Sequence, residues 1–158
     1  MKLERLTKAH NREDFTSKSP EIDNWLRTQA SQFERKNRAH TWVLTEDGKC
    51  IAGFFTLTHE ELDISDEENL SKKLKTAAGP RQKLSVVLVG YLAKDKTHGA
   101  DLSLTLIMEA VLQLIERTSL APVHGIILDP LTPNLVPLYE RLGFKVVDEK
   151  LRMLLSLV

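Results

Sequence analysis

The sequence predicts a mixed α+β domain in which a central sheet is flanked by helices. The stretch 84–93 is almost continuously apolar, as is typical of a central strand that is covered on both faces. A helical pattern at 101–117 and a second apolar strand at 123–128 follow it, which indicates parallel pairing through a right-handed crossover. Two β-rich segments around the turn at 46–49 form a hairpin. Because helices and strands alternate along the chain, we expect one mixed sheet.

The first part of the chain begins with a short strand at 2–6 and a polar loop at 11–19. A helix is expected to start here. Ser19 is the predicted N-cap, Pro20 is the predicted first helical residue, and Glu21 is an acid in the first turn. Apolar residues then recur with helical spacing, so we expect one helix with a single buried face. That face comprises Ile22, Trp25, Leu26, Ala30 and Phe33.

The hairpin strands are expected at 41–45 and 50–58. The stretch 60–83 differs, because an acidic run is followed by a basic run and Gly79-Pro80 interrupts it. It is typical of a solvated insertion with one short helix. The alternative is a surface for a substrate or a partner.

The last part of the chain starts with a proline-rich turn at 129–134 and a helix that carries Tyr139. Gly143 lies where a helix commonly ends in a left-handed residue, since glycine adopts that conformation without a Cβ penalty. Segments 144–147 and 151–158 are expected to be antiparallel strands.

Length and composition fit a single domain over 1–158 with a proper core. Lys plus Arg and Asp plus Glu number 22 each, which argues against a protein that coats nucleic acid through its net charge. With one cysteine, Cys50, we expect no internal disulfide and no cysteine-based metal site. No apolar leader and no uninterrupted apolar run of membrane-spanning length occur, so we expect a cytoplasmic protein.

The segment Tyr139-Glu140-Arg141-Leu142-Gly143-Phe144 resembles a motif of the GCN5-related N-acetyltransferases. Other blocks, in the same order as in that family, resemble its bacterial toxin branch, whose members pair with ribbon-helix-helix antitoxins. These blocks are Phe15, Ser19, Ile22, Asp23, Trp25 and Leu26, then Thr41-Trp42-Val43, then Gly53-Phe54-Phe55-Thr56-Leu57, and finally 89–95.

The resemblance implies an acetyl-CoA-dependent enzyme in which Tyr139 is the general acid for the leaving thiolate. The alternative for Tyr139 is a half-buried core tyrosine with its hydroxyl at the surface. The central strand is implied to splay from its neighbour, so that backbone N–H groups of Leu92, Ala93 and Lys94 face the pantetheine arm and the thioester oxygen. The implied pyrophosphate loop is His98-Gly99-Ala100-Asp101-Leu102-Ser103, at a helix N-terminus.

This loop departs from the family form Q/R-x-x-G-x-G/A, because His98, Asp101 and Ser103 replace its usual residues. A carboxylate at about 4 Å from a phosphate costs on the order of 1–4 kcal/mol, or one to three decades of affinity. Asp101 also fits a helix N-cap, which stabilises by about 1 kcal/mol. Two hypotheses therefore stand: an acetyltransferase with an altered loop, or a cofactor-less binding module that retains the fold.

The acceptor implied by the toxin branch is the α-amine of aminoacyl-tRNA. His59, Glu60 and Glu61 are candidate general bases, but an α-amine has a pKa near 7.7–8 and needs a base less than lysine does. Basic residues that can contact RNA phosphates are Arg35, Arg38, Lys72, Lys73 and Arg81, with Lys36, Lys75 and Lys83 beside them. A homodimer and a ribbon-helix-helix antitoxin are the expected partners.

Overall fold

The computed structural model describes all residues, 1–158, and the chain forms two compact units. The first unit comprises Met1–Thr58 and Gly90–Leu114, and the second comprises His59–Val89 and Ile115–Val158. Strands β3 (Ile51–Asp63) and β4 (Lys83–Lys94) pass from one unit into the other. The strands are hydrogen-bonded in the order β1-β2-β3-β4-β5-β7-β6, which confirms the mixed α+β sheet. None of the helices is both long and apolar enough to span a membrane.

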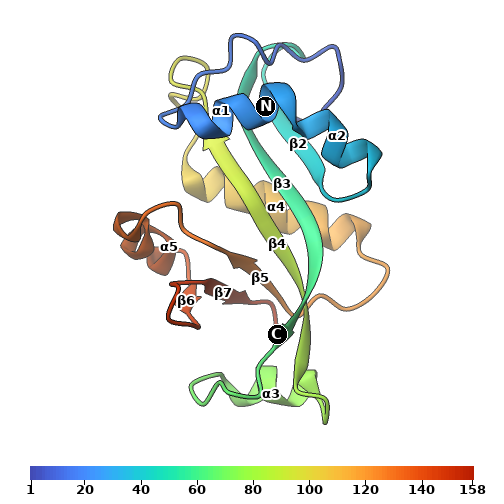
Figure 1. Ribbon diagram of the computed structural model, residues 1–158, viewed down its shortest axis with the longest axis vertical. Helices are drawn as coiled ribbons and strands as arrows, with labels where there is room; N and C mark the ends of the chain where they lie inside the picture. Colours follow the sequence, from blue (N-terminus) through green and yellow to red (C-terminus); the bar gives the residue numbers. More distant parts are fainter. The chain divides into compact units, whose positions relative to one another are not determined.

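In the first unit, β1 (Lys2–Arg5) and β2 (His40–Thr45) are neighbours, and β2 pairs in turn with β3. Both pairings are antiparallel, and Val43 lies opposite Phe54 in the β2–β3 ladder. The predicted hairpin is therefore confirmed. In Figure 1, α1 lies in front of β3, and α4 (Leu104–Thr118) passes behind it.

The first helix begins as the sequence predicts. Ser19 is the N-cap of α1 (Pro20–Thr28), with its hydroxyl accepting from the N–H of Ile22, and Pro20 is the first residue. The expected single helix is wrong, however, because α1 ends at Thr28. Gln29, with φ −115° and ψ −27°, lies between α1 and a separate helix α2 (Ala30–Arg35).

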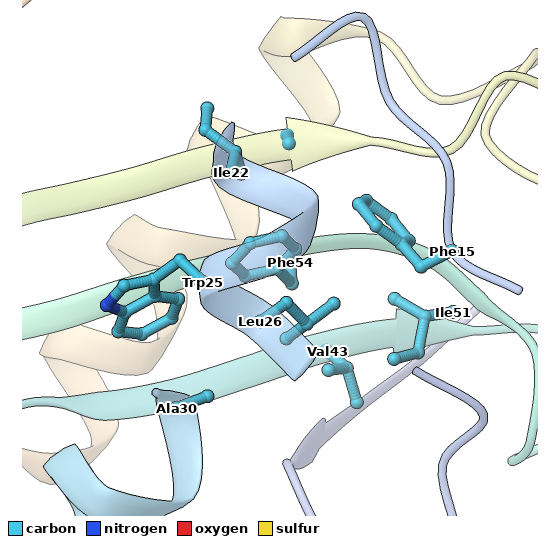
Figure 2. Packing of buried hydrophobic residues seen from close by; sticks show 9 residues of the cluster. Phe15, Ile22, Trp25, Leu26, Ala30, Val43, Ile51 and Phe54 are labelled. Atoms are coloured by element: carbon cyan, nitrogen blue, oxygen red, sulfur yellow. The ribbon is translucent and has the colours of Figure 1, made fainter. Parts of the chain in front are cut away.

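The core of the first unit is nevertheless built from the predicted helix face (Figure 2). Phe15 contacts Phe54 edge to face, with ring centroids 5.3 Å apart. Trp25 stacks on Tyr91 of β4 at 4.4 Å and contacts Phe33 of α2 at 5.3 Å. Burial of these large rings stabilises the unit, because aromatic side chains remove the most apolar surface from water.

The second unit contains the remaining strands, β5 (Gly125–Leu128), β6 (Lys145–Val146) and β7 (Met153–Ser156). The predicted parallel pairing of β4 with β5 is confirmed, since Val86 lies opposite Gly125 and Val89 opposite Leu128. Strand β7 pairs antiparallel with both β5 and β6, which confirms the expected closing strands.

The expected insertion at 60–83 is shorter than predicted, because β3 continues to Asp63 and β4 begins at Lys83. Its one short helix, α3 (Lys72–Ala78), is capped by Ser71 and is not merely solvated. Leu74 and Ala78 are buried in a core cluster with Ile64 and Leu84. These two residues are four positions apart, which places them on one face of a helix. This spacing, within a segment rich in charged residues, is the sequence signal that predicts their burial.

Candidate active site

Asp95 organises the loop that follows β4. Its carboxylate is buried, with 4% of the residue exposed, and accepts hydrogen bonds from the backbone N–H groups of Thr16 at 2.8 Å and of Thr97 and His98 at 2.9 Å. Burial alone raises the pKa of this carboxyl, but the N–H donors outweigh it and hold the pKa below its ordinary value. Sequence reasoning missed this role, because Thr16 is remote in the chain.

Gly99 is required by the packing of this loop. Its N–H donates to the carbonyl oxygen of Asp95 at 3.0 Å. A Cβ at this position lies 2.4 Å from the carbonyl oxygen of Ala52 and 2.6 Å from that of Asp95. Those oxygens belong to the backbone and cannot turn away, so only glycine fits. Gly99 therefore allows the loop to pack closely against β3. The family motif does not predict this structural requirement.

The start of α4 differs from the prediction. Leu102 donates its N–H to the carbonyl of Gly99 at 3.0 Å and is buried, whereas Ser103 accepts the N–H of Leu106 on its hydroxyl at 3.1 Å. Ser103 is therefore the N-cap, and the expectation that Asp101 caps the helix is wrong. The physical reason is the burial of Leu102 beside Gly53, where a Cβ lies 2.7 Å from the Leu102 side chain.

The loop and the first turn of α4 leave backbone donors available. The hydrogen bonds of this region occupy the N–H groups of Thr97, His98, Gly99 and Leu102. A helix N-terminus favours negative charge, so donors that remain here suit an anion. The N–H groups that make no hydrogen bond are those of Ala100, Asp101, Ser103, Leu104 and Thr105.

Asp101 is itself exposed at this anion-favouring position. Leu104 and Thr105 are additions to the residues that the sequence indicated, and they follow from the later start of the helix. His98 and Leu102 also belong to this loop, but their backbone N–H groups donate hydrogen bonds to Asp95 and Gly99 within it.

The end of β4 fits the splay that the resemblance implies. The parallel ladder between β4 and β5 covers Val86 to Val89, and β4 continues to Lys94. Leu92, Ala93 and Lys94 therefore lie beyond the last rung of that ladder. The Lys94 side chain turns to the adjacent loop, where its Nζ donates to the carbonyl of Leu102 at 3.1 Å.

Tyr139 lies in the second unit on α5 (Val136–Arg141), directly after the 3₁₀ turn Pro133–Leu135. The helix ends as predicted at Gly143, with φ +100°. The N–H of Gly143 donates to Glu140 and that of Phe144 to Tyr139, the paired bonds of a Schellman motif. This motif fixes the phenol ring against Phe144, with centroids 5.8 Å apart and planes at 71°.

The environment of Tyr139 keeps its hydroxyl protonated. The residue is only 8% exposed, less than the half-buried tyrosine of the alternative interpretation, and burial raises the pKa of its phenol above the ordinary value. At neutral pH the Oη atom therefore carries a proton. A buried neutral phenol fits the role of a proton donor.

Two of the candidate bases are held in ion pairs. Glu60 contacts Arg152 at 3.2 Å, and the same guanidinium binds Asp129 at 2.8 Å and thereby lowers the pKa of that carboxyl. Glu61 contacts Lys83 at 3.3 Å and Arg81 at 3.7 Å. Both carboxylates therefore have cationic partners within 4 Å.

The predicted RNA-contacting residues fall into two sets. Arg35 and Arg38 belong to the first unit, where the Arg38 guanidinium lies 4.5 Å from the centroid of the Phe33 ring. Lys72, Lys73 and Arg81 belong to the second unit, and the two lysines are exposed at the start of α3. The structure therefore groups these residues within each unit only.

The sequence matches no protein-family model. Solved structures nevertheless match almost the whole chain. AtaT complexed with acetyl-methionyl-tRNAfMet has a TM-score of 0.81 and 19% identity, covering 98% of this chain and 94% of that one. A tyrosine-to-phenylalanine mutant of KacT has a TM-score of 0.80 and 17% identity over the same shares. AtaTR bound with AcCoA has a TM-score of 0.76 and 20% identity, covering 98% and 92%.

These similarities cover almost the whole chain. The identities are low, so the likeness concerns the fold. This chain has the fold of the GCN5-related N-acetyltransferase toxins, and the resemblance that its sequence motifs indicated is confirmed at that level.

Proposed function

We propose that this protein is an N-acetyltransferase that transfers the acetyl group of acetyl-CoA to the α-amine of an aminoacyl-tRNA. The observation that carries the proposal is the full-length match to AtaT, which was solved with acetyl-methionyl-tRNAfMet. The available N–H groups at the start of α4 and the neutral phenol of Tyr139 support it. The chain, 1–158, would act as one functional domain.

The residues at the start of α4 fit the pyrophosphate of acetyl-CoA. The free N–H groups of Ala100, Asp101, Ser103, Leu104 and Thr105 are donors for phosphate oxygens, at the positive end of a 15-residue helix. His98, Gly99 and Leu102 would support this loop from within. Backbone groups of Leu92, Ala93 and Lys94 would line the arm of the cofactor.

When bound, acetyl-CoA supplies an activated acetyl thioester. Tyr139 would hold the proton required by the leaving sulfur at its Oη atom, because a phenol is already protonated at neutral pH at its ordinary pKa of about 10 and burial raises this pKa further. The Schellman motif and the Phe144 contact would position the phenol. Backbone N–H groups at the end of β4 would stabilise the developing oxyanion.

An α-amine is the acceptor that this site supports best. Glu60 and Glu61 are each ion-paired with a cation, so neither carboxylate stands alone as a dedicated base for a lysine ammonium. An α-amine, with a pKa near 7.7–8, is neutral roughly two decades more often than lysine at pH 7. This difference makes a dedicated base less necessary.

The cofactor part of the proposal is tested by thermal unfolding with acetyl-CoA. At 100 times the dissociation constant, a bound ligand raises the free energy of unfolding by about 2.7 kcal/mol. We expect that stabilisation, and an unchanged melting temperature at millimolar acetyl-CoA would instead favour the cofactor-less binding module. Desulfo-CoA, which retains the pyrophosphate, controls for binding through the loop alone.

Replacing Asp101 by asparagine is expected to tighten acetyl-CoA binding by roughly one to three decades, because a like charge near the phosphates is removed. Stability should fall by no more than about 0.3–1 kcal/mol, since Ser103 caps α4 and Asp101 contributes only its charge at the helix N-terminus. Calorimetric titration measures the first quantity, and thermal melting the second. An unchanged affinity would show that this carboxylate points away from the phosphates.

Charge reversal at Lys72 and Lys73 is expected to weaken tRNA binding and flatten its salt dependence by about 0.7–0.9 log–log units per lost phosphate contact. Binding of acetyl-CoA should not change. Filter binding of tRNA across a salt series measures the slope, with Lys145→Glu as the exposed control in the same unit. Equal slopes in all variants would remove Lys72 and Lys73 from the RNA surface.

The proposal extends to partners by analogy with AtaT, which has been solved bound to the C-terminus of its antitoxin AtaR. We place this protein in the bacterial cytoplasm as a homodimer that is neutralised by a ribbon-helix-helix antitoxin. Co-purification with the product of an adjacent gene, together with light scattering, tests both statements.

A further inference from the structure

A pocket of about 450 Å³ lies within the second unit. Its polar lining comes from the end of β3, the turn before β4, the start of β4 and the residue just before β5. Ala78 and Leu84 supply an apolar part of the wall. The polar residues that matter here are His59, Glu61, Arg81, Lys83, Ser85 and His124.

The imidazole of His124 presents a fixed donor. Its Nδ1 accepts the backbone N–H of Ser85 at 3.0 Å, and its own backbone N–H donates to the Ser85 carbonyl at 2.7 Å. In the neutral ring, an Nδ1 that accepts leaves the proton on Nε2. The Nε2–H group of His124 is therefore available as a hydrogen-bond donor.

The lining holds two cations and two carboxylates, and both cations share one of those carboxylates. Arg81 and Lys83 both contact Oε1 of Glu61, at 3.7 and 3.3 Å. One carboxylate therefore faces two cations. The other carboxylate in the lining, Glu60, is already bound by Arg152 at 3.2 Å.

We propose that this pocket binds a phosphate group of the RNA acceptor, an inference that rests on the proposed function and adds His124 and Ser85 to its RNA-contacting residues. A guanidinium, an ammonium, the Nε2–H of His124 and the Ser85 hydroxyl all donate, and phosphate oxygens only accept. The side chains of Arg81 and Lys83 are 78% and 40% exposed, so they would contact the phosphate group at the protein surface.

The test measures binding of uncharged tRNA over a salt series, using substitutions of opposite sign. Lys83→Gln removes a phosphate contact and is expected to lower the magnitude of the log–log slope by about 0.7–0.9. Glu61→Gln releases Arg81 and Lys83 from their shared carboxylate and is expected to tighten binding. Lys150→Gln and Glu149→Gln make the same charge changes at exposed positions of the same unit and should have smaller effects.

The source of the phosphate is distinguished by titrating inorganic phosphate and, separately, tRNA while following the His124 imidazole by NMR, with His124→Gln to assign the signal. We expect tRNA to shift this resonance at micromolar concentration and inorganic phosphate only weakly. A strong response to inorganic phosphate, with tRNA binding unaltered in the variants, would overturn the inference in favour of a small-anion site.

Failure of the inference differs from failure of the proposed function. If the wild-type protein acetylates aminoacyl-tRNA but Lys83→Gln and Glu61→Gln behave like their controls, the pocket is not an RNA site and the enzyme assignment stands. If the wild-type protein neither acetylates nor binds tRNA, both proposals are wrong.

Discussion

Replacement of Tyr139 by phenylalanine is expected to reduce acetyl transfer by roughly 10²–10⁴-fold, the range for loss of a general acid. The change removes only the hydroxyl and keeps the ring against Phe144. The Schellman motif uses backbone groups and is unaffected. We therefore expect the fold and acetyl-CoA affinity to remain, while the turnover number falls.

Tyr91→Phe is the matched control, because it removes the other tyrosine hydroxyl of this chain and preserves the ring that stacks on Trp25. Steady-state rates, acetyl-CoA affinity and melting temperature are measured for both variants. A Tyr139→Phe enzyme as fast as the wild-type protein would exclude Tyr139 as the acid. A loss of stability in that variant would instead support a purely structural tyrosine.

Replacement of Asp95 by asparagine is expected to destabilise the protein by roughly 2–4 kcal/mol. One carboxylate oxygen accepts from Thr16 and the other from Thr97 and His98. An asparagine amide nitrogen must replace one of these oxygens, so at least one backbone N–H then faces another donor. The loop before α4 should loosen, and acetyl-CoA binding should weaken by about tenfold or more, which corresponds to about 1.4 kcal/mol.

Asp101→Asn makes the same chemical change in the same loop at an exposed residue and is the control for stability. The two variants should move acetyl-CoA affinity in opposite directions. Chemical denaturation and calorimetric titration give both quantities. If Asp95→Asn were as stable as the wild-type protein, the carboxylate would not be what organises this loop.

The same carboxylate predicts a pH dependence of stability. Because its pKa is lower in the folded protein than the unfolded value of about 3.9, its contribution is fully present above that value. It is lost as the pH falls through the lower folded pKa. Relative to the wild-type protein, Asp95→Asn should therefore show a smaller loss of unfolding free energy below about pH 4, and parallel curves there would contradict this linkage.

Much of the fold follows from local sequence signals. Ser19 and Pro20 start α1 where capping rules place them, and Gly143 ends α5 in a left-handed conformation. The apolar run at 84–93 forms the central strand with its parallel neighbour. In these places the chemistry that decides the structure lies within a few residues of the element.

Other features depend on contacts that are distant in the sequence. Both Asp101 and Ser103 are good N-cap residues, and the choice between them depends on Leu102 being buried beside Gly53. The bond from Thr16 to Asp95 joins segments 79 positions apart, so no local pattern reveals it. The boundary between α1 and α2 at Gln29 contains neither glycine nor proline, and the helical spacing of apolar residues continues across it. The sequence therefore does not predict this boundary.

The candidate site was predictable to the extent that a family motif matched it. Tyr139 and the region of the pyrophosphate loop came from motifs, whereas Leu104 and Thr105 required the observed start of α4. No local pattern predicts that cations engage Glu60 and Glu61, since their partners Arg152, Arg81 and Lys83 are separated from them in sequence.

The central claim, acetyl transfer to the α-amine of aminoacyl-tRNA, is tested most directly by competition between acceptors. The protein is incubated with labelled acetyl-CoA, bulk aminoacylated tRNA and a lysine-rich peptide, with Tyr139→Phe in parallel, and the label in each acceptor is counted. We predict label in the tRNA fraction, sensitive to mild alkaline deacylation and reduced roughly 10²–10⁴-fold in the variant. Label in the peptide and none in the tRNA would contradict the account.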